Sequence, residues 1–576
     1  MDKAEVIEIL SQIGTLLELI GENPFKVRAY YNAARTLEGR SESMEELVGA
    51  YGHTPLLQDL PGFGEALTEK ITILVTTGKL KYFEELKKKV PAGLLEMIRI
   101  PGLGPKKVKA LYDQLKIDTI AKLKEGCEKG KIRSLEGFGE KTEKKILDGI
   151  QHLKVYAERR RYDEALVAAL PMLERLKKDP KVIRAEVCGS MRRHRETIGD
   201  IDILASSKDP ASVMERFVTL PEVESVVAHG GTKSAITLKK NGVQVDLRVV
   251  SDVEFPFALH YFTGSAEHNT QLRTLAKEFD LKLNEYGLFK GTKRISCKDE
   301  SEIFKKLKLS YIPPELREGM GEIEAAKEGK IPDLLESKDI RGVFHIHSTW
   351  SDGTAPLEEM VAEAERLGLE YIGLSDHSQS AYYAGGLKPD RLKEQEKEIE
   401  RLRKKFKIRI FWGTESDILP DGSLDYPEKI LERFDFVIGS VHSSFTMPES
   451  EMTMRIIRAF KNKYFTMLGH ATGRLILQRE GYAVDMKQVI QAAADYRKVI
   501  ELNANPHRFD LDWRLGPFAK EKKVRVCINP DAHSVEGIAA YLYGIGIARK
   551  GWFTKKDVLN SLSAQEMERY LRTKAA

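Results

Sequence analysis

The sequence predicts a multidomain protein in which an all-helical region is followed by an α+β domain and then by a parallel α/β barrel or layered sheet. Residues 1–155 show helical periodicity broken by short Gly-rich turns. From about Lys181, short β-branched runs alternate as strands do. Beyond residue 338, strand-like runs alternate with helical segments, as in parallel α/β folds. With 576 residues, the chain is also too long for one ordinary core.

The composition is typical of a globular protein, with 42% hydrophobic and 31% charged residues. The longest apolar stretches, such as residues 538–547, are shorter than the roughly 20 residues needed to cross a bilayer. Acidic residues in the first turn do not fit a secretory signal, so we expect a cytoplasmic protein without a membrane span. The net charge of +5 is too small to diagnose nucleic-acid binding. Four scattered cysteines exclude a disulfide framework.

Three similar turns recur in the helical region: Pro61-Gly62-Phe63-Gly64, Pro101-Gly102-Leu103-Gly104 and Glu136-Gly137-Phe138-Gly139. Such turns match the helix-hairpin-helix motif, in which glycines let the backbone approach a DNA phosphate closely. One such turn alone would be as well explained by an ordinary helix connection. Three in one region, each followed by a lysine-bearing helix, favour DNA binding through these six glycines.

The segment from Cys188 to Ile203 carries the pattern of a nucleotidyltransferase core. Asp200 and Asp202 are two apart on a predicted strand, so both carboxylates can hold Mg²⁺ on one face, and Asp246 supplies a third carboxylate. Gly189 and Ser190 would open a helix that meets a triphosphate, with Arg193 nearby. An isolated Asp-x-Asp would be better explained as a turn. The upstream Gly-Ser and the third aspartate favour two-metal nucleotidyl transfer.

Metal-binding side chains also follow the strand-like runs of the C-terminal region. Six of the 13 histidines occupy this type of position, which packing needs alone would not produce. Imidazoles and carboxylates without thiolates favour Mn²⁺, Zn²⁺ or Fe²⁺ clusters. The candidate ligands are His345, His347, Asp352, His377, Glu415, His442, His470, Asp531 and His533.

The first half of the chain resembles the family X DNA polymerases. Tyr261-Phe262-Thr263-Gly264-Ser265 is the string that lines the sugar and base of the incoming nucleotide in that family, and the likeness extends over about residues 1–315. The resemblance implies that Ser190, Arg193 and Gly199 contact phosphates. It further implies that Tyr261, Phe262 and Gly264 contact the sugar, Asn269 the base edge and Arg273 the template.

The stretch from Asn23 to Leu80 resembles the small lyase domain of DNA polymerase beta. By this resemblance Lys26, Tyr30 and Lys70 fall on positions used for 5′-phosphate binding and for the Schiff-base nucleophile. Ala66 stands where the animal enzyme has a basic residue. Lyase activity therefore remains open, and a solvated Lys70 is the favoured interpretation.

The C-terminal ligand set resembles the PHP family of phosphoesterases, whose distorted (β/α)7 barrel binds up to three metals at its mouth. The resemblance implies that Glu415 bridges metals and that the domain hydrolyses phosphodiesters. Arg508 could hold a substrate phosphate, although a surface salt bridge is an equally good interpretation.

These patterns predict a monomeric DNA polymerase that fills short gaps in base excision repair, with a Mn²⁺- or Zn²⁺-dependent 3′→5′ exonuclease and abasic-site cleavage as an open activity. Its partners would be gapped or primer-template DNA and deoxynucleoside triphosphates. The alternative is a DNA-targeted phosphoesterase whose polymerase half mainly binds DNA. The expected domains are a lyase-like domain at 1–95, fingers at 96–157, palm at 158–251, thumb at 252–315, a linker at 316–338 and the PHP domain at 339–576.

Overall fold

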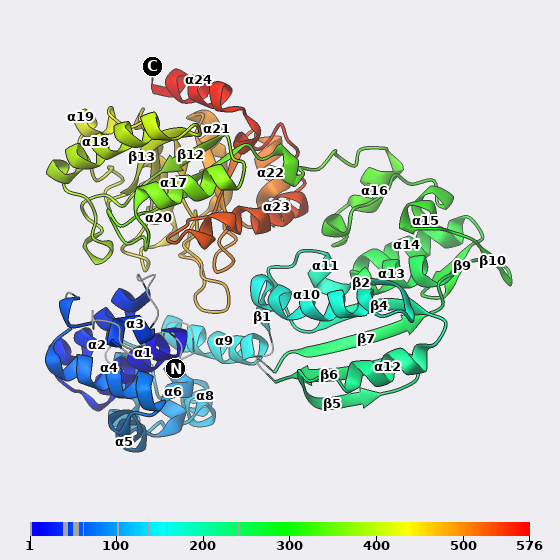
Figure 1. Cartoon of the computed structure of the whole chain (residues 1–576), viewed down its shortest axis with the longest axis horizontal. Coiled ribbons are helices and arrows are strands. Elements are labelled where there is room, and N and C mark those ends of the chain that lie inside the picture. Colours follow the sequence, from blue (N-terminus) through cyan, green and yellow to red (C-terminus); the bar gives the residue numbers. More distant parts are fainter. Residues whose placement is uncertain are drawn as a thin grey trace.

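The computed structural model describes residues 3–38, 44–49, 57–60, 63–98, 100, 103–135, 137–157, 159–239 and 242–575. Figure 1 shows three parts: a helical part in blue, a mixed part with an open sheet in cyan to green, and a barrel in yellow-green to red. In the described ranges, no helix is long and apolar enough to span a membrane. All four cysteines are buried and free, as expected.

The N-terminal part is helical, and the described residues of its three Gly-rich turns make the same backbone hydrogen bond. Phe63, Leu103 and Phe138 are buried, and each backbone N–H donates to the carbonyl three residues earlier at 3.0 to 3.1 Å. This shared hydrogen bond confirms the repeats. The elements are α1 (Lys3–Ile20), α2 (Pro24–Glu38), α3 (Met44–Val48), η2 (Leu57–Asp59), α4 (Glu65–Thr77), α5 (Lys81–Lys89), α6 (Ala92–Ile98), α7 (Pro105–Leu115), α8 (Ile120–Glu128) and α9 (Glu140–Ala157).

A five-stranded mixed sheet, in the order β2-β4-β7-β6-β5, forms the centre of the middle part. Its β4 and β7 run parallel, and alternating apolar residues of both strands pack under α10 and α12. The elements are β1 (Arg160–Arg161), α10 (Tyr162–Lys178), β2 (Val182–Val187), α11 (Gly189–Arg192), β3 (Thr197–Ile198), β4 (Ile201–Ser207), α12 (Pro210–Val218), β5 (Val223–His229), β6 (Lys233–Leu238) and β7 (Gln244–Val250).

A small domain built on a three-stranded sheet follows, and the chain then runs to the barrel. The segment predicted as a linker, 316–338, is packed and not extended in solvent, because it contains α16 and buries Glu322 and Leu335 completely. The elements are α13 (Phe255–Thr263), α14 (Ala266–Glu278), β8 (Lys282–Asn284), β9 (Gly287–Lys290), β10 (Lys293–Ile295), α15 (Glu300–Lys306), η3 (Pro314–Leu316), α16 (Glu322–Lys327) and η4 (Ser337–Asp339).

The C-terminal part is a nearly closed barrel of seven parallel strands in sequence order. The bridge between Ile346 and Ala532 joins the first and last strands, so all seven carboxyl ends meet at one rim. The strands are β11 (Gly342–Ile346), β12 (Tyr371–Leu374), β13 (Arg409–Asp417), β14 (Phe436–Ser440), β15 (Met467–Leu468), β16 (Val499–Asn503) and β17 (Val526–Asn529).

Helices cover the outside of this barrel (Figure 1). The helical elements of this part are α17 (Leu357–Arg366), η5 (Tyr382–Ala384), α18 (Pro389–Lys405), α19 (Glu428–Leu431), α20 (Glu449–Phe460), α21 (Met486–Asp495), η6 (Trp513–Leu515), α22 (Gly516–Glu521), η7 (Glu536–Ala540), α23 (Tyr541–Lys550), η8 (Leu559–Ser561) and α24 (Ala564–Ala575). One buried apolar cluster includes residues of both the five-stranded sheet domain and the barrel, which indicates that these two parts pack together.

Candidate active sites

The three predicted polymerase carboxylates lie at one end of the parallel pair β4 and β7. Asp202 pairs in register with Asp246, and Asp200 immediately precedes β4. Burial, together with the negative charges of Asp200 and Asp246, raises the pKa of Asp202 to about 7. Lys233 contacts Asp246 at 3.1 Å. The three carboxylates therefore repel one another, and a metal ion or the ammonium group of Lys233 can neutralise their negative charge.

The Gly-Ser turn approaches this site closely. Gly189 has a φ of +58°, and a Cβ there would lie 2.2 Å from Oδ2 of Asp202, so no other residue fits without displacing the carboxylate. The turn begins α11, which is four residues long and contains Ser190. Gly199 lies between β3 and β4, one residue before Asp200.

Two arginines of α11 and its C-cap are held differently. Arg192 forms an ion pair with the buried Glu300 at 2.6 Å, a partner 108 residues away that the sequence analysis missed. Arg193 donates from Nε to Glu318 at 3.1 Å and from Nη1 to the carbonyl of Thr263. Its side chain is 13% exposed. In the part of the chain that is described, Nη2 of Arg193 makes no hydrogen bond.

The Tyr-Phe-Thr-Gly-Ser string forms the end of α13 and the start of α14. Tyr261 and Phe262 pack edge to face, and Arg248 of β7 lies 4.4 Å from the Phe262 ring. Asn269 donates to the carbonyl of Tyr261 at 2.8 Å, so it fixes the string that it follows. Gly264 is buried and Arg273 on α14 is exposed.

Among the predicted DNA-binding glycines, Gly62 and Gly102 lie outside the described residues. Gly64 and Gly104 both cap helices in nearly the same extended conformation, with φ of −78° and −72°. Gly137 has a φ of +81°, and a Cβ on Gly139 would meet nothing within 4 Å. The turns thus present open backbone.

Lys26 and Lys70, from different helices, lie over the same ring of Tyr82, with Nζ 5.8 and 5.3 Å from its centroid. Tyr30 stacks on that ring. Lys26 also pairs with Glu22 at 3.1 Å, whereas Lys70 bonds the carbonyl of Ala66. The three residues implied by the lyase resemblance are therefore neighbours.

The nine predicted ligands of the barrel converge at the rim where the strands end. His345 lies in β11, Glu415 in β13, and the others follow strands, as the sequence analysis expected. Their ligand atoms fall into four groups, each within 4.8 Å: His347, Asp352, His377 and His533; His345, His470 and Asp531; His345, His347 and Glu415; and His377, Glu415 and His442.

Glu415 is the centre of this cluster. Its oxygens lie between 2.9 and 3.5 Å from ring nitrogens of His345, His347, His377, His442 and His470. Although burial opposes ionisation, the charges of the surrounding histidines hold the pKa of Glu415 well below its usual range. An ionised carboxylate is therefore in contact with five imidazoles.

The residues present fit divalent metals. Among the described residues, five buried ring nitrogens of the cluster form no well-aligned hydrogen bond, although three of them lie within 3.5 Å of Glu415: Nε2 of His345, both nitrogens of His347, Nδ1 of His377 and Nδ1 of His470. A buried polar atom without a partner is costly, so such a concentration is explained by ligands that the cluster is built to receive. The polymerase carboxylates are not among the groups that meet the same 4.8 Å criterion.

The sequence analysis missed the carboxylates that orient the histidines. Glu501 accepts from Nδ1 of His345 at 2.5 Å and from the backbone of His470 at 2.9 Å. Asp417 bonds Nδ1 of His442 at 2.7 Å. Such contacts fix the tautomer and leave the other nitrogen for metal. The signal in the sequence that could have identified Glu501 and Asp417 is the position of each carboxylate on a buried strand.

Two further residues are now placed. Asp376 is saturated by the backbone and hydroxyl of Ser348, by Ser351 and by Gln395, so it braces the rim. Arg508 lies 3.2 Å from Asp531, a salt bridge at the metal cluster itself. The ion pair of Arg508 is therefore formed at the metal cluster, which is also where Arg508 would hold a substrate phosphate.

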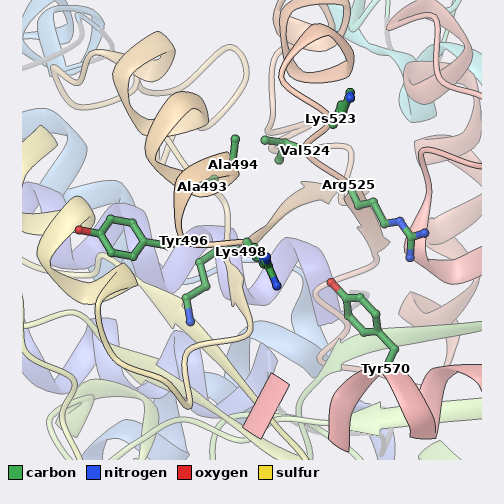
Figure 2. Close-up of a pocket in the computed structure, with 9 residues that line it drawn as sticks. Ala493, Ala494, Tyr496, Lys498, Lys523, Val524, Arg525 and Tyr570 are labelled. Carbon is green, nitrogen blue, oxygen red and sulfur yellow. The ribbon is translucent and has the colours of Figure 1, made fainter. Parts of the chain in front are cut away.

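A basic hollow of about 540 Å³ lies at the opposite end of the barrel (Figure 2). Lys498 and Arg525 line it and directly precede β16 and β17, whereas the metal ligands follow strand carboxyl ends. The lining contains no carboxylate and no histidine. This hollow is not part of the metal site.

Comparison with known proteins identifies domains in both halves of the chain. Family models match for a helix-hairpin-helix domain at 1–80, a SAM-like helix-hairpin-helix tandem at 94–152, the DNA polymerase beta thumb at 258–318 and the PHP domain at 344–505. The DNA polymerase/3′-5′ exonuclease PolX of Bacillus subtilis (strain 168) is 39% identical over 576 residues, covering 99% of this chain and all of that protein. The chain belongs to the family X DNA polymerases with a C-terminal PHP domain.

Other relatives of this family X member match less than half of the chain. DNA polymerase lambda of Rattus norvegicus is 27% identical over 45% of the chain and 48% of its own length. The probable phosphatase TTE1963 of Caldanaerobacter subterraneus subsp. tengcongensis is 29% identical over 38% of the chain and 84% of its own length. Polymerase and PHP domains of this kind use divalent metals, and both carry the matching side chains here.

Proposed function

We propose that this protein is a DNA-directed DNA polymerase that fills short gaps during base-excision-type repair and trims 3′ ends with its PHP domain. The observation that carries the polymerase is the in-register pair Asp202 and Asp246 on parallel strands, with Asp200 beside it. Three carboxylates at one strand end are the ligand set that two-metal nucleotidyl transfer needs.

In this proposal the polymerase site binds Mg²⁺ through Asp200, Asp202 and Asp246. Divalent metal there supplies Lewis acidity for attack of the 3′-hydroxyl on the α-phosphate. Arg193, held along one edge by Glu318 and Thr263, directs its Nη2 donors to a phosphate. Gly189, Ser190 and Gly199 add backbone donors. Tyr261, Phe262 and Gly264 line the sugar, Asn269 supports them, and Arg273 contacts the template.

The PHP site then removes mispaired or damaged 3′ ends. Its nine ligands would hold up to three Mn²⁺ or Zn²⁺ ions, which supply Lewis acidity for phosphodiester hydrolysis. Glu415 would be the ligand shared between them, and Glu501 and Asp417 would fix the histidine tautomers. Arg508 beside Asp531 is placed to meet a substrate phosphate.

The helical region would hold the DNA. The open backbone at Gly64, Gly104 and Gly139 gives phosphates room to approach, and the lysines of the following helices supply charge. We assign residues 1–95 to a lyase-like domain, 96–157 to fingers, 158–251 to palm, 252–315 to thumb and 339–576 to PHP, in a monomer. Lyase action by Lys70 and abasic-site cleavage remain separate questions.

The deciding experiment is extension of a labelled primer across a one-nucleotide gap by the intact protein with Mg²⁺. Wild-type protein should add one nucleotide, and the Asp200→Ala, Asp202→Ala double variant should add none while it still trims 3′ ends with Mn²⁺. The alternative function, a DNA-targeted phosphoesterase, predicts trimming without extension in the wild type. Extension at the wild-type rate in the double variant would refute the assigned carboxylates.

A further inference from the structure

Lys550 is the last residue of α23 in the PHP domain, and its side chain is completely buried. Its ammonium group nevertheless donates hydrogen bonds to residues outside that domain. Its Nζ donates to the carbonyl of Arg193 at 2.9 Å, to the carbonyl of Glu315 at 3.3 Å and to Oε1 of Glu318. An ammonium group has three N–H donors, so all are used. Every acceptor precedes the PHP domain: Arg193 lies in the palm, Glu315 at the end of the thumb and Glu318 in the segment at 316–338.

Glu318 connects this lysine to the nucleotide site. Its side chain is 8% exposed, and it accepts from Nε of Arg193 at 3.1 Å and from Arg195 at 3.2 Å as well as from Lys550. The same carboxylate thus holds the arginine proposed to meet the triphosphate. Because a buried ion pair is unfavourable when one partner is removed, Glu318 and Lys550 depend on each other.

The helix that carries Lys550 is also packed tightly against the segment that follows α11. A Cβ on Gly546 would lie 2.0 Å from Nδ1 of His194, the neighbour of Arg193. Nearby, Arg549 pairs with Glu315 at 2.7 Å and Arg474 with Glu196 at 2.8 Å. The contact is therefore close, charged on both sides and centred on the turn that contains Arg193.

We propose that Lys550 is a positioning residue of the polymerase: the PHP domain fixes Glu318 and the Arg193 backbone, and so sets the geometry in which Arg193 binds the nucleotide triphosphate. The proposal rests on the assigned role of Arg193. It makes the PHP domain a structural part of the nucleotide site, in addition to its own phosphoesterase chemistry.

The test is steady-state gap filling by the full chain carrying Lys550→Met, a change that keeps an unbranched side chain, shorter by the terminal nitrogen, and removes its charge. The KM for the deoxynucleoside triphosphate should rise about tenfold, the scale of one lost charged hydrogen bond, with a smaller change in kcat. DNA affinity and Mn²⁺-dependent 3′ trimming should remain at wild-type level. Lys550→Arg keeps the positive charge and should raise the KM less than Lys550→Met does.

The matched control is Lys498→Met. Lys498 is a buried lysine of the same domain, but it donates to the carbonyls of Asn462 and Phe465 within the barrel. This variant should leave the KM unchanged. A similar KM increase from both lysine variants would overturn the proposal, because it would reflect general loosening of the PHP domain.

Two further variants separate the possible failures. Arg193→Ala should raise the KM at least as much as Lys550→Met. A wild-type KM in Arg193→Ala would refute the assigned role of Arg193, whereas a wild-type KM in Lys550→Met alone would refute the relay. If Lys550→Met loses 3′ trimming as well as synthesis, the Gly546→Ala variant provides the deciding test. This substitution keeps every charge, and it should raise the KM for the nucleotide because the added methyl group displaces His194. An unchanged KM in Gly546→Ala would overturn the proposal.

Discussion

The two metal-binding sites of this protein are built to different degrees. At the PHP rim, nine ligands form four groups, and within each group the ligand atoms lie within 4.8 Å of one another. Buried carboxylates accept hydrogen bonds from two of the histidines and orient them. In the polymerase site, Asp202 has a raised pKa and Asp246 is engaged by Lys233 at 3.1 Å. A closed barrel brings seven strand ends to one rim, whereas an open sheet offers one parallel pair. The ligand side chains of the barrel rim are therefore gathered by the fold alone, whereas the polymerase carboxylates do not form such a cluster.

The largest effect should come from removing ligands of the PHP site. His345→Ala with His347→Ala removes at least one ligand from three of the four ligand groups, so bound Mn²⁺ and 3′→5′ exonuclease activity should be lost together. The loss should far exceed the roughly 10–100-fold of an outer-shell change. Gap filling with Mg²⁺ should persist. Metal content, primer degradation and extension on one preparation provide the measurement, and exonuclease activity at the wild-type rate without metal would contradict the mechanism.

A smaller effect should follow from loosening that site without removing a ligand. Glu501→Gln weakens the bond that orients His345 and should reduce Mn²⁺ affinity by about 10–100-fold. Asp376→Asn is the control, because that buried carboxylate bonds serines and Gln395 and no histidine. Calorimetric titration of both metal-free variants gives the comparison. Equal losses would show that burial, and not histidine orientation, governs affinity.

The polymerase site can act only on DNA that the protein has bound. Substitution of a glycine in a helix-hairpin-helix turn tests whether that turn contributes to DNA binding. Gly104→Ala meets no atom within 4 Å and keeps an ordinary φ of −72°, so the fold should tolerate it. If a phosphate approaches this backbone, DNA affinity should fall by about fivefold or more. Fluorescence anisotropy with gapped DNA measures the change. Lys498→Met serves as a control away from DNA, and wild-type affinity in Gly104→Ala would remove this turn from the DNA contacts.

The smallest effect concerns the proton on Asp202. The unfolded carboxyl ionises near pH 3.8 and the folded one near pH 7, so the folded state binds more protons between these values and loses stability as pH rises. In EDTA, Asp202→Asn should therefore be more stable than wild type by a margin that grows from about pH 4 to pH 7 and is constant above. We expect a Tm difference of about a few degrees at pH 7. A margin independent of pH would contradict the raised pKa.

The sequence by itself determined the chemistry of this protein. Strand periodicity placed Asp202 and Asp246 on strands and the PHP ligands at strand ends, and the three glycine turns predicted repeats, which make the same backbone hydrogen bond. These inferences succeed because the spacing of residues along a strand or turn is local and is preserved in the fold.

Only the tertiary structure decided which residues support that chemistry. Glu501, Asp417 and Glu300 resemble any buried acidic residue in the sequence, and their roles depend on partners 25 to 156 residues away. The segment at 316–338 has the composition of a linker, yet it is packed and contains Glu318, which joins Arg193 to Lys550 of the barrel. Charge and composition are properties of a residue, whereas burial and ion pairing depend on which distant segments the fold brings together.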